Sequence, residues 1–232
     1  MKIIKKAELV NELLTKEFPQ VETPLIHSSA YELLIATILS AQTPDVTTNK
    51  VTPELFKKYP DVASLSKADL SEVTEIIRRV NYNKTKARNL IKTANIIICN
   101  FNSEVPYTMD ELTSLRGVGR KVANVVISEW FVRRTDFVEP VGFVVDTHVK
   151  RVSYRLGLTK NTDPVKIEKD LMKTFPKENW VEVSLRFIFH GRKTCKSQNP
   201  ACESCPLRDI CPQIGLEKSK EIKRIKVSKE NK

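Results

Sequence analysis

Four of the five cysteines lie in one short segment with the spacing Cys195-x6-Cys202-x2-Cys205-x5-Cys211. Four thiolates this close in sequence can bind one inorganic core, either a tetrahedral zinc ion or a [4Fe–4S] cube with one cysteine per iron. Zinc modules usually contain two CxxC pairs, whereas this segment has one CxxC and looser outer spacings, which favours the iron–sulfur cluster. Zinc and disulfide bonds stay as alternatives. Because all four thiolates would be ligands, we expect a structural role.

Basic residues surround the first of these cysteines. Arg192 and Lys193 precede Cys195, and Lys196 follows it. A cluster that holds this loop rigid would place the three cations against a phosphate, a contact that positions a nucleic acid without reading its sequence.

A second candidate site is the segment "LRGVGRKVANVVI", in which Gly117, Val118 and Gly119 separate two helical stretches. The glycines allow a tight turn and a close approach to another surface. The N–H groups of this turn and of the next helix converge on one point, which suits an anion such as DNA phosphate, and Arg120 adds a cation. A helix–turn–helix corner without a ligand is the alternative.

Lys121 occupies an unfavourable position for a cation. The start of a helix and the neighbouring Arg120 both disfavour the ammonium form, which leaves more free amine. A free amine is a nucleophile that can form a Schiff base. We therefore predict an attacking lysine, with a second phosphate contact as the alternative.

Asp146, in "VVDTHV", follows an apolar run and precedes a helical pattern. Such a residue is typically an N-cap, whose carboxylate accepts backbone N–H groups. An ionised carboxylate could also support positive charge that develops on a sugar, or remove a proton, and the roles are compatible. We assign no chemistry to His27, His148 or His190.

The elements that must position these residues are helices. Glycine is scarce and no long alternating strand pattern occurs, so we predict an all-α protein. Capping residues, such as Ser29 with Glu32, and apolar periodicity, such as Leu90, Ala94 and Ile97, predict helices over about 31–41, 70–80, 84–101, 109–116, 147–157, 163–175 and 180–191. Cys99 lies in the third of these among isoleucines, and we predict that it is a small buried hydrophobe. The segment "VGFVVDTH", residues 141–148, is expected to be an extended connection.

Composition limits the possible partners. With 39 Lys and Arg against 28 Asp and Glu, the chain carries a net charge of +11, which favours a polyanion such as nucleic acid or an anionic membrane surface. A generally lysine-rich proteome is the alternative. We find no transmembrane run or secretory signal, so we expect a reducing, cytoplasmic setting. From residue 214 the chain is lysine-rich with almost no core-forming residues, and we expect a disordered or frayed helical basic tail.

These motifs together resemble the endonuclease III family, the helix–hairpin–helix DNA glycosylases with a [4Fe–4S] cluster. The glycine hairpin, "VVDTHVKRV" and the cysteine spacing carry the resemblance, and "LLIATILSAQTPDVTTNK", "NKTKARNLI" and "FHGRKTC" follow it in order. It covers about residues 8–211, nearly the whole chain.

The resemblance implies two helical lobes that bind DNA in the cleft between them. Residues 25–135 would form a six-helix, barrel-like domain with the hairpin at about 112–131. Residues 1–24 and 136–213 would form the iron–sulfur domain, followed by the tail at 214–232. Lys121 and Asp146 would then face each other across the cleft.

The resemblance also implies base-excision DNA repair by a monomeric enzyme. A damaged pyrimidine would be flipped out of double-stranded DNA, Lys121 would attack the sugar C1′ with help from Asp146, and β-elimination at the abasic site would nick the strand. Gln42 would fill the gap left by the base. Tyr82 falls where relatives carry a leucine wedge, and Arg116 replaces the usual hairpin proline. A glycosylase for a mismatched base and a non-catalytic, metal-stapled DNA-binding module stay as alternatives.

Overall fold

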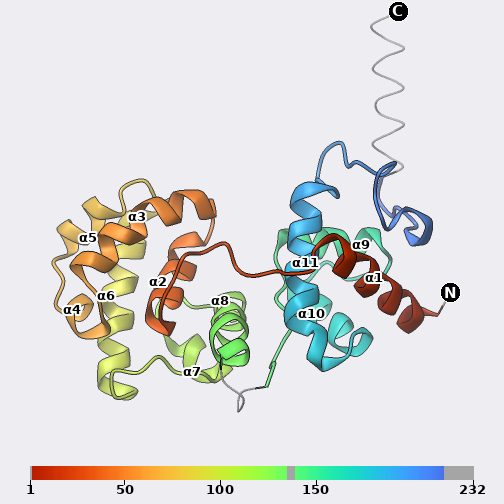
Figure 1. Ribbon diagram of the computed structural model, residues 1–232. Helices are drawn as coiled ribbons and strands as arrows, with labels where there is room; N and C mark the ends of the chain where they lie inside the picture. The colour runs from red at the N-terminus through yellow and green to blue at the C-terminus, as the bar shows by residue number, and fades with distance from the viewer. Residues whose placement is uncertain (1, 135–138, 217–232) are drawn as a thin grey trace, which may run out of the picture. The chain divides into compact units, whose positions relative to one another are not determined.

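The computed structural model describes residues 2–134 and 139–216. Helices are the regular elements of these residues, which contain no β-strand, and this confirms the all-α prediction. Two compact units are present, one formed by Glu22–Val141 and one that joins the chain up to Val21 with the chain from Gly142 onward (Figure 1). The predicted domain boundary at 135/136 and residues 217–232 of the predicted tail lie outside the described residues. At the start of that tail the prediction is wrong, because the Ile214 N–H donates to the carbonyl of Arg155 and Leu216 is buried.

The unit Glu22–Val141 is built around helix α2 (Ala30–Ser40), which is buried along nearly its whole length. The side chain of Ser29 caps this helix by accepting the N–H of Glu32 at 3.1 Å, as the capping pattern predicts. The other elements of this unit are α3 (Asp45–Lys58), α4 (Val62–Ser66), α5 (Leu70–Ile76), α6 (Asn83–Asn100), α7 (Met109–Ser114), α8 (Arg120–Val126) and a π-helical turn, Ile127–Val132.

Helix α6 packs its predicted apolar stripe into the core of this unit, with Leu90, Ala94 and Ile97 buried. The prediction for Cys99 is wrong, because its side chain is exposed. Two residues along an α-helix turn the side chain by about 200°. Since Ile97 faces inward, Cys99 faces solvent.

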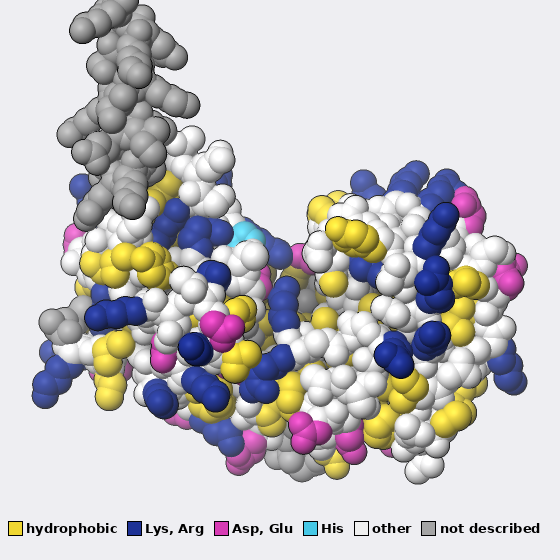
Figure 2. Space-filling model, turned by 180° about the vertical axis from the view of Figure 1, so that it is seen from behind, with side chains coloured by type: hydrophobic (Ala, Val, Ile, Leu, Met, Phe, Trp, Pro, Cys, Tyr) yellow, Lys and Arg dark blue, Asp and Glu magenta, His cyan; other side chains and the backbone are white. Residues whose placement is uncertain are grey.

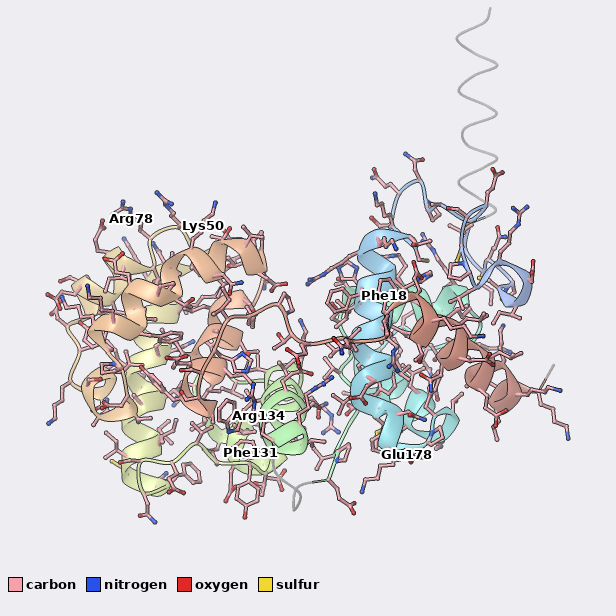
Figure 3. The ribbon with its side chains drawn as sticks, viewed as in Figure 1. Phe18, Lys50, Arg78, Phe131, Arg134 and Glu178 are labelled. Carbon is pink, nitrogen blue, oxygen red and sulfur yellow. The ribbon has the colours of Figure 1, made fainter. Side chains whose placement is uncertain are left out.

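The second unit joins both ends of the chain. Helix α1 (Ile3–Glu17) packs against α10 (Pro164–Thr174) and α11 (Trp180–Lys193), and Val10 and Leu14 contribute to the same core as Phe187. Phe18, which directly follows α1, lies beside α11 in Figure 3. The unit also contains α9 (Thr147–Arg155) and the short 3-10 turns Lys177–Asn179 and Arg208–Ile210.

Residues 141–146 of the predicted connection are extended and lead directly into α9, which already includes Thr147 and His148. Its position is fixed by Phe143, which is fully buried, and by the Val144 N–H, which donates to Ser184 Oγ at 3.1 Å. This anchoring determines where Asp146, at the start of α9, is placed. None of the helices in the described part of the chain is long and apolar enough to cross a membrane.

Candidate active-site and cluster residues

The glycine hairpin between α7 and α8 rests on α6. Gly117 has a φ of +81°, and a Cβ added there would lie 3.1 Å from Asn89 Nδ2. Thr93 Oγ1 donates a hydrogen bond to the carbonyl of Arg116 at 2.8 Å. The turn therefore requires glycine for its conformation and for its close approach to α6.

The start of α8 is open to solvent. Gly119 is the N-cap, and a Cβ added there would meet nothing within 4 Å. Arg120 and Lys121, which begin the helix, are both exposed. Val118, however, turns its side chain into the core, so only its backbone can reach a ligand. The predicted anion site is thus accessible through backbone N–H groups and two cations.

Gln42 and Tyr82 project from two loops that are tied together in the same unit. Both residues are exposed, and both have a left-handed backbone with φ of +55° and +59°. The side chain of Asn81 donates to the carbonyl of Gln42, and its backbone N–H donates to Thr43 Oγ1 at 3.2 Å. Non-glycine residues adopt this conformation only when their surroundings hold them there.

Asp146 is the N-cap of α9, which confirms its capping role. Its Oδ1 accepts the N–H groups of His148 and Val149, both at 2.8 Å. The residue is half-buried, and among the described residues no group bonds to Oδ2. One carboxylate oxygen therefore fixes the side chain while the other can act on a ligand.

Two histidines have structural surroundings. Burial lowers the pKa of His148, whose ring contacts Arg151 Nη2 at 3.1 Å and lies beneath Gly191. Burial likewise lowers the pKa of His190, whose Nδ1 lies 3.4 Å from Oε2 of Glu17 on α1. Arg151 also donates to the carbonyls of Gly191 and Cys195, so it links the helix of Asp146 to the cysteine segment.

The four predicted ligands, Cys195, Cys202, Cys205 and Cys211, line one cavity beside α9 and α11. In the described part of the chain, no three His, Cys, Asp or Glu side chains close on a single metal ion. Four cysteine thiols that line one cavity can supply the four ligands of a [4Fe–4S] core, one for each iron. Burial raises the pKa of Cys205 to about 11, so a metal core is needed to hold it as a thiolate at neutral pH.

Arg155 holds the cysteine segment in place. The residue is buried, and its guanidinium donates to the carbonyls of Lys196 and Ser197 at 2.6 and 3.0 Å. It also approaches Cys195 Sγ at 3.4 Å. A positive charge beside the thiols would offset the negative charge of a thiolate-bound cluster.

The three predicted phosphate contacts near the cysteines are all exposed, namely Arg192, Lys193 and Lys196. Lys193 is engaged with α1, since its Nζ lies 3.2 Å from Glu17 Oε1 and 5.4 Å from the ring centre of Phe18. Figure 2 shows Lys and Arg side chains spread over the surface of both units, with acidic side chains among them. In Figure 3, Lys50 projects outward from the unit that also carries Gln42.

Comparison with known proteins identifies the family. The sequence profile of the HhH-GPD superfamily of base excision DNA repair proteins matches residues 35–177, and that of the iron–sulfur binding domain of endonuclease III matches residues 195–211. Endonuclease III of Synechocystis sp. is 44% identical over 200 residues, which are 86% of this chain and 89% of that protein. Endonuclease III of Bacillus subtilis is 41% identical over 209 residues, covering 90% and 92% of the two chains.

The fold is also similar to solved structures. A trapped endonuclease III–DNA covalent intermediate, in an estranged-adenine complex, matches with a TM-score of 0.84 and 41% identity over 92% of this chain and 97% of that one. A non-covalent endonuclease III–DNA complex matches with the same TM-score, 42% identity and the same coverage. A chain with this hairpin, this cysteine segment and relatives that match along nearly its whole length belongs to the endonuclease III family of HhH-GPD base excision DNA repair proteins.

Proposed function

We propose that this chain removes oxidised pyrimidines from double-stranded DNA and then nicks the strand at the abasic site. Membership of the family makes it a DNA glycosylase and abasic-site lyase with a [4Fe–4S] cluster. The proposal adds the substrate and the residues that act. The observation that carries it is Lys121, an exposed amine at the open start of α8, directly after the glycine turn.

Lys121 Nζ is the nucleophile of the proposed reaction. It attacks C1′ of the deoxyribose, and the glycosidic bond breaks as the damaged base leaves with the bonding electrons. Ring opening gives a Schiff base between Nζ and C1′. Loss of a proton from C2′ then expels the 3′ phosphate by β-elimination, and hydrolysis of the Schiff base releases the enzyme.

Asp146 is the proposed carboxylate of the same reaction. Oδ1 is already occupied by the two N–H groups of α9, so Oδ2 is the atom that acts. A fixed negative charge stabilises the positive charge that develops on the sugar, and it can accept the proton that the attacking amine loses.

The remaining predicted contacts divide between base opening and phosphate binding. Gln42 would occupy the gap left by the flipped base and Tyr82 would stack between the bases nearby, which offsets the few kcal/mol that flipping costs. The proposed phosphate contacts are the backbone of the hairpin with Arg120, and the cations Arg192, Lys193 and Lys196.

The proposed cluster ligands are the four cysteines, and one substitution tests them. Cys205→Ser should lower the iron content from about four atoms per chain and weaken the visible absorption, because one iron loses its thiolate. The matched control is Cys99→Ser, which changes the exposed fifth cysteine. Metal analysis and absorption spectra provide the readout. Full iron content in Cys205→Ser, or a colourless zinc-loaded protein, would contradict the assignment.

A panel of damaged duplexes tests the proposed substrate. The duplexes carry an oxidised pyrimidine, an oxidised purine, a mismatched adenine or thymine, or no lesion. We expect rapid excision and strand cleavage only with the oxidised pyrimidine. Preferential action on a mismatch would make the chain a different glycosylase of the superfamily, and tight binding without excision would make it a DNA-binding module.

The two lobes of the proposed enzyme are residues 25–135 and residues 1–24 with 136–213. The two compact units described above support this division. We propose that the enzyme works as a monomer in the cytoplasm, where reducing conditions keep the cysteines available for the cluster.

A further inference from the structure

A buried lysine at the start of α6 has no part in the proposed chemistry. Lys86 is 7% exposed, and its Nζ points to the end of α2 rather than to solvent. It donates hydrogen bonds to the carbonyls of Leu39 and Ala41 at 2.7 and 2.6 Å and to Thr43 Oγ1 at 3.1 Å. Three neutral oxygens thus hold a buried ammonium group.

The end of α2 explains why these oxygens attract a cation. The last carbonyls of a helix lack intrahelical partners and carry the negative end of the helix dipole. Helix α2 has no basic residue in its own last turn, so Lys86 from α6 supplies the missing charge. Burial lowers the pKa of Lys86 to about 8, and the group therefore stays an ammonium at pH 7.

The three acceptors surround Gln42 in sequence. Thr43 Oγ1 also accepts the N–H of Asn81, the residue before Tyr82. The Asn81 side chain closes the network by donating to the carbonyl of Gln42. The ammonium group therefore belongs to one hydrogen-bond network that joins the two loops from which Gln42 and Tyr82 project.

We propose that Lys86 is a positioning residue that fixes Gln42 and Tyr82 in the geometry needed to open a base pair. The inference rests on the proposed function, because it concerns how the two side chains enter DNA. Packing alone does not explain a lysine here, since Leu90, Ala94 and Ile97 already anchor α6 in the core. Both exposed residues have left-handed backbones, which relax to commoner conformations once the network is lost.

The reaction step that depends on Lys86 distinguishes a positioning role from a general structural role. An intact lesion must be unpaired and unstacked before the sugar can be attacked, whereas an abasic site has no base to remove from the stack. Loose placement of Gln42 and Tyr82 should therefore slow base excision much more than it slows cleavage at a pre-formed abasic site.

Single-turnover assays of Lys86→Met on two duplexes test the proposal. We expect excision from an oxidised-pyrimidine duplex to fall by about tenfold or more, and incision of an abasic duplex to change by less than about threefold. Lys92→Met, which removes the same charge from an exposed position on the same helix, should leave both rates within about twofold of wild type.

A second variant guards against a folding defect in Lys86→Met. Thr43→Val keeps the side-chain shape and both lysine–carbonyl bonds but removes the hydroxyl between Lys86 and Asn81. This variant should also slow base excision more than abasic-site incision, but by a smaller factor than Lys86→Met. Equal slowing on both duplexes, or no slowing in either variant, would overturn the inference. A wild-type protein inactive on both duplexes would instead overturn the proposed function, and this inference with it.

Discussion

The Lys121→Ala variant should lose abasic-site lyase activity by roughly a thousandfold or more and form no borohydride-trapped adduct with abasic DNA. Without the amine no Schiff base can form, and only slow background elimination remains. Lys121 is exposed at the start of α8, so its truncation should change the free energy of unfolding by less than about 0.5 kcal/mol. Trapping on denaturing gels, with thermal unfolding alongside, measures both quantities.

The Lys121→Arg variant distinguishes a nucleophilic role of Lys121 from a phosphate contact. Arginine keeps the positive charge and can still bind a phosphate, but its guanidinium does not attack a sugar. If Lys121 acts only through its charge, the arginine variant should retain activity. Arg120→Ala supplies the opposite control, since it should weaken DNA binding and make that binding less dependent on salt, while adduct formation persists at saturating DNA. Adduct formation by Lys121→Ala would assign the chemistry to another amine.

The Asp146→Asn variant should lose base excision by about a hundredfold to ten-thousandfold while its stability stays close to that of wild type. Asparagine is as good an N-cap as aspartate, so its side-chain oxygen can still accept the N–H groups of His148 and Val149. What it lacks is the negative charge on the second oxygen. Single-turnover excision rates and melting temperatures measured on the same preparation give the two effects separately.

Asp146→Ala is the matched comparison, because it removes cap and charge together. It should show the catalytic loss and, in addition, a loss of about 1 kcal/mol in the free energy of unfolding. If Asp146→Asn keeps the full rate and only Asp146→Ala is impaired, the carboxylate is a helix cap without a chemical role.

Much of this architecture follows from local chemistry in the sequence. The caps at Ser29 and Asp146, the stripe on α6 and the turn at Gly117 each depend on residues close together in the chain, and the structure contains them as predicted. The cysteine spacing is equally local, and the four thiols line one cavity. Family resemblance added the expected roles of Lys121 and Gln42, which spacing alone leaves open.

The features that sequence reasoning missed depend on long-range contacts. Lys86 reaches carbonyls more than 40 positions earlier, and Arg155 holds a loop about 40 positions later. A signal for Lys86 is present nevertheless, since it lies four residues before Leu90 and so on the buried face of α6. A lysine on such a face indicates a partner elsewhere. The prediction that Cys99 is buried was wrong for a related reason. Apolar residues that are neighbours in sequence lie on both faces of a helix, so they do not show which face a residue occupies.

The unit that joins the two ends of the chain has a consequence for biosynthesis. As the polypeptide leaves the ribosome, α1 emerges before the helices that cover Ala7, Val10 and Leu14. Meanwhile residues 22–141 are complete and can fold on their own core, since domains generally fold as units during synthesis. The apolar face of α1 therefore stays uncovered until those later helices have been made. A polypeptide truncated before those helices would expose the apolar face of α1, and chaperones and proteases would recognise that exposed surface.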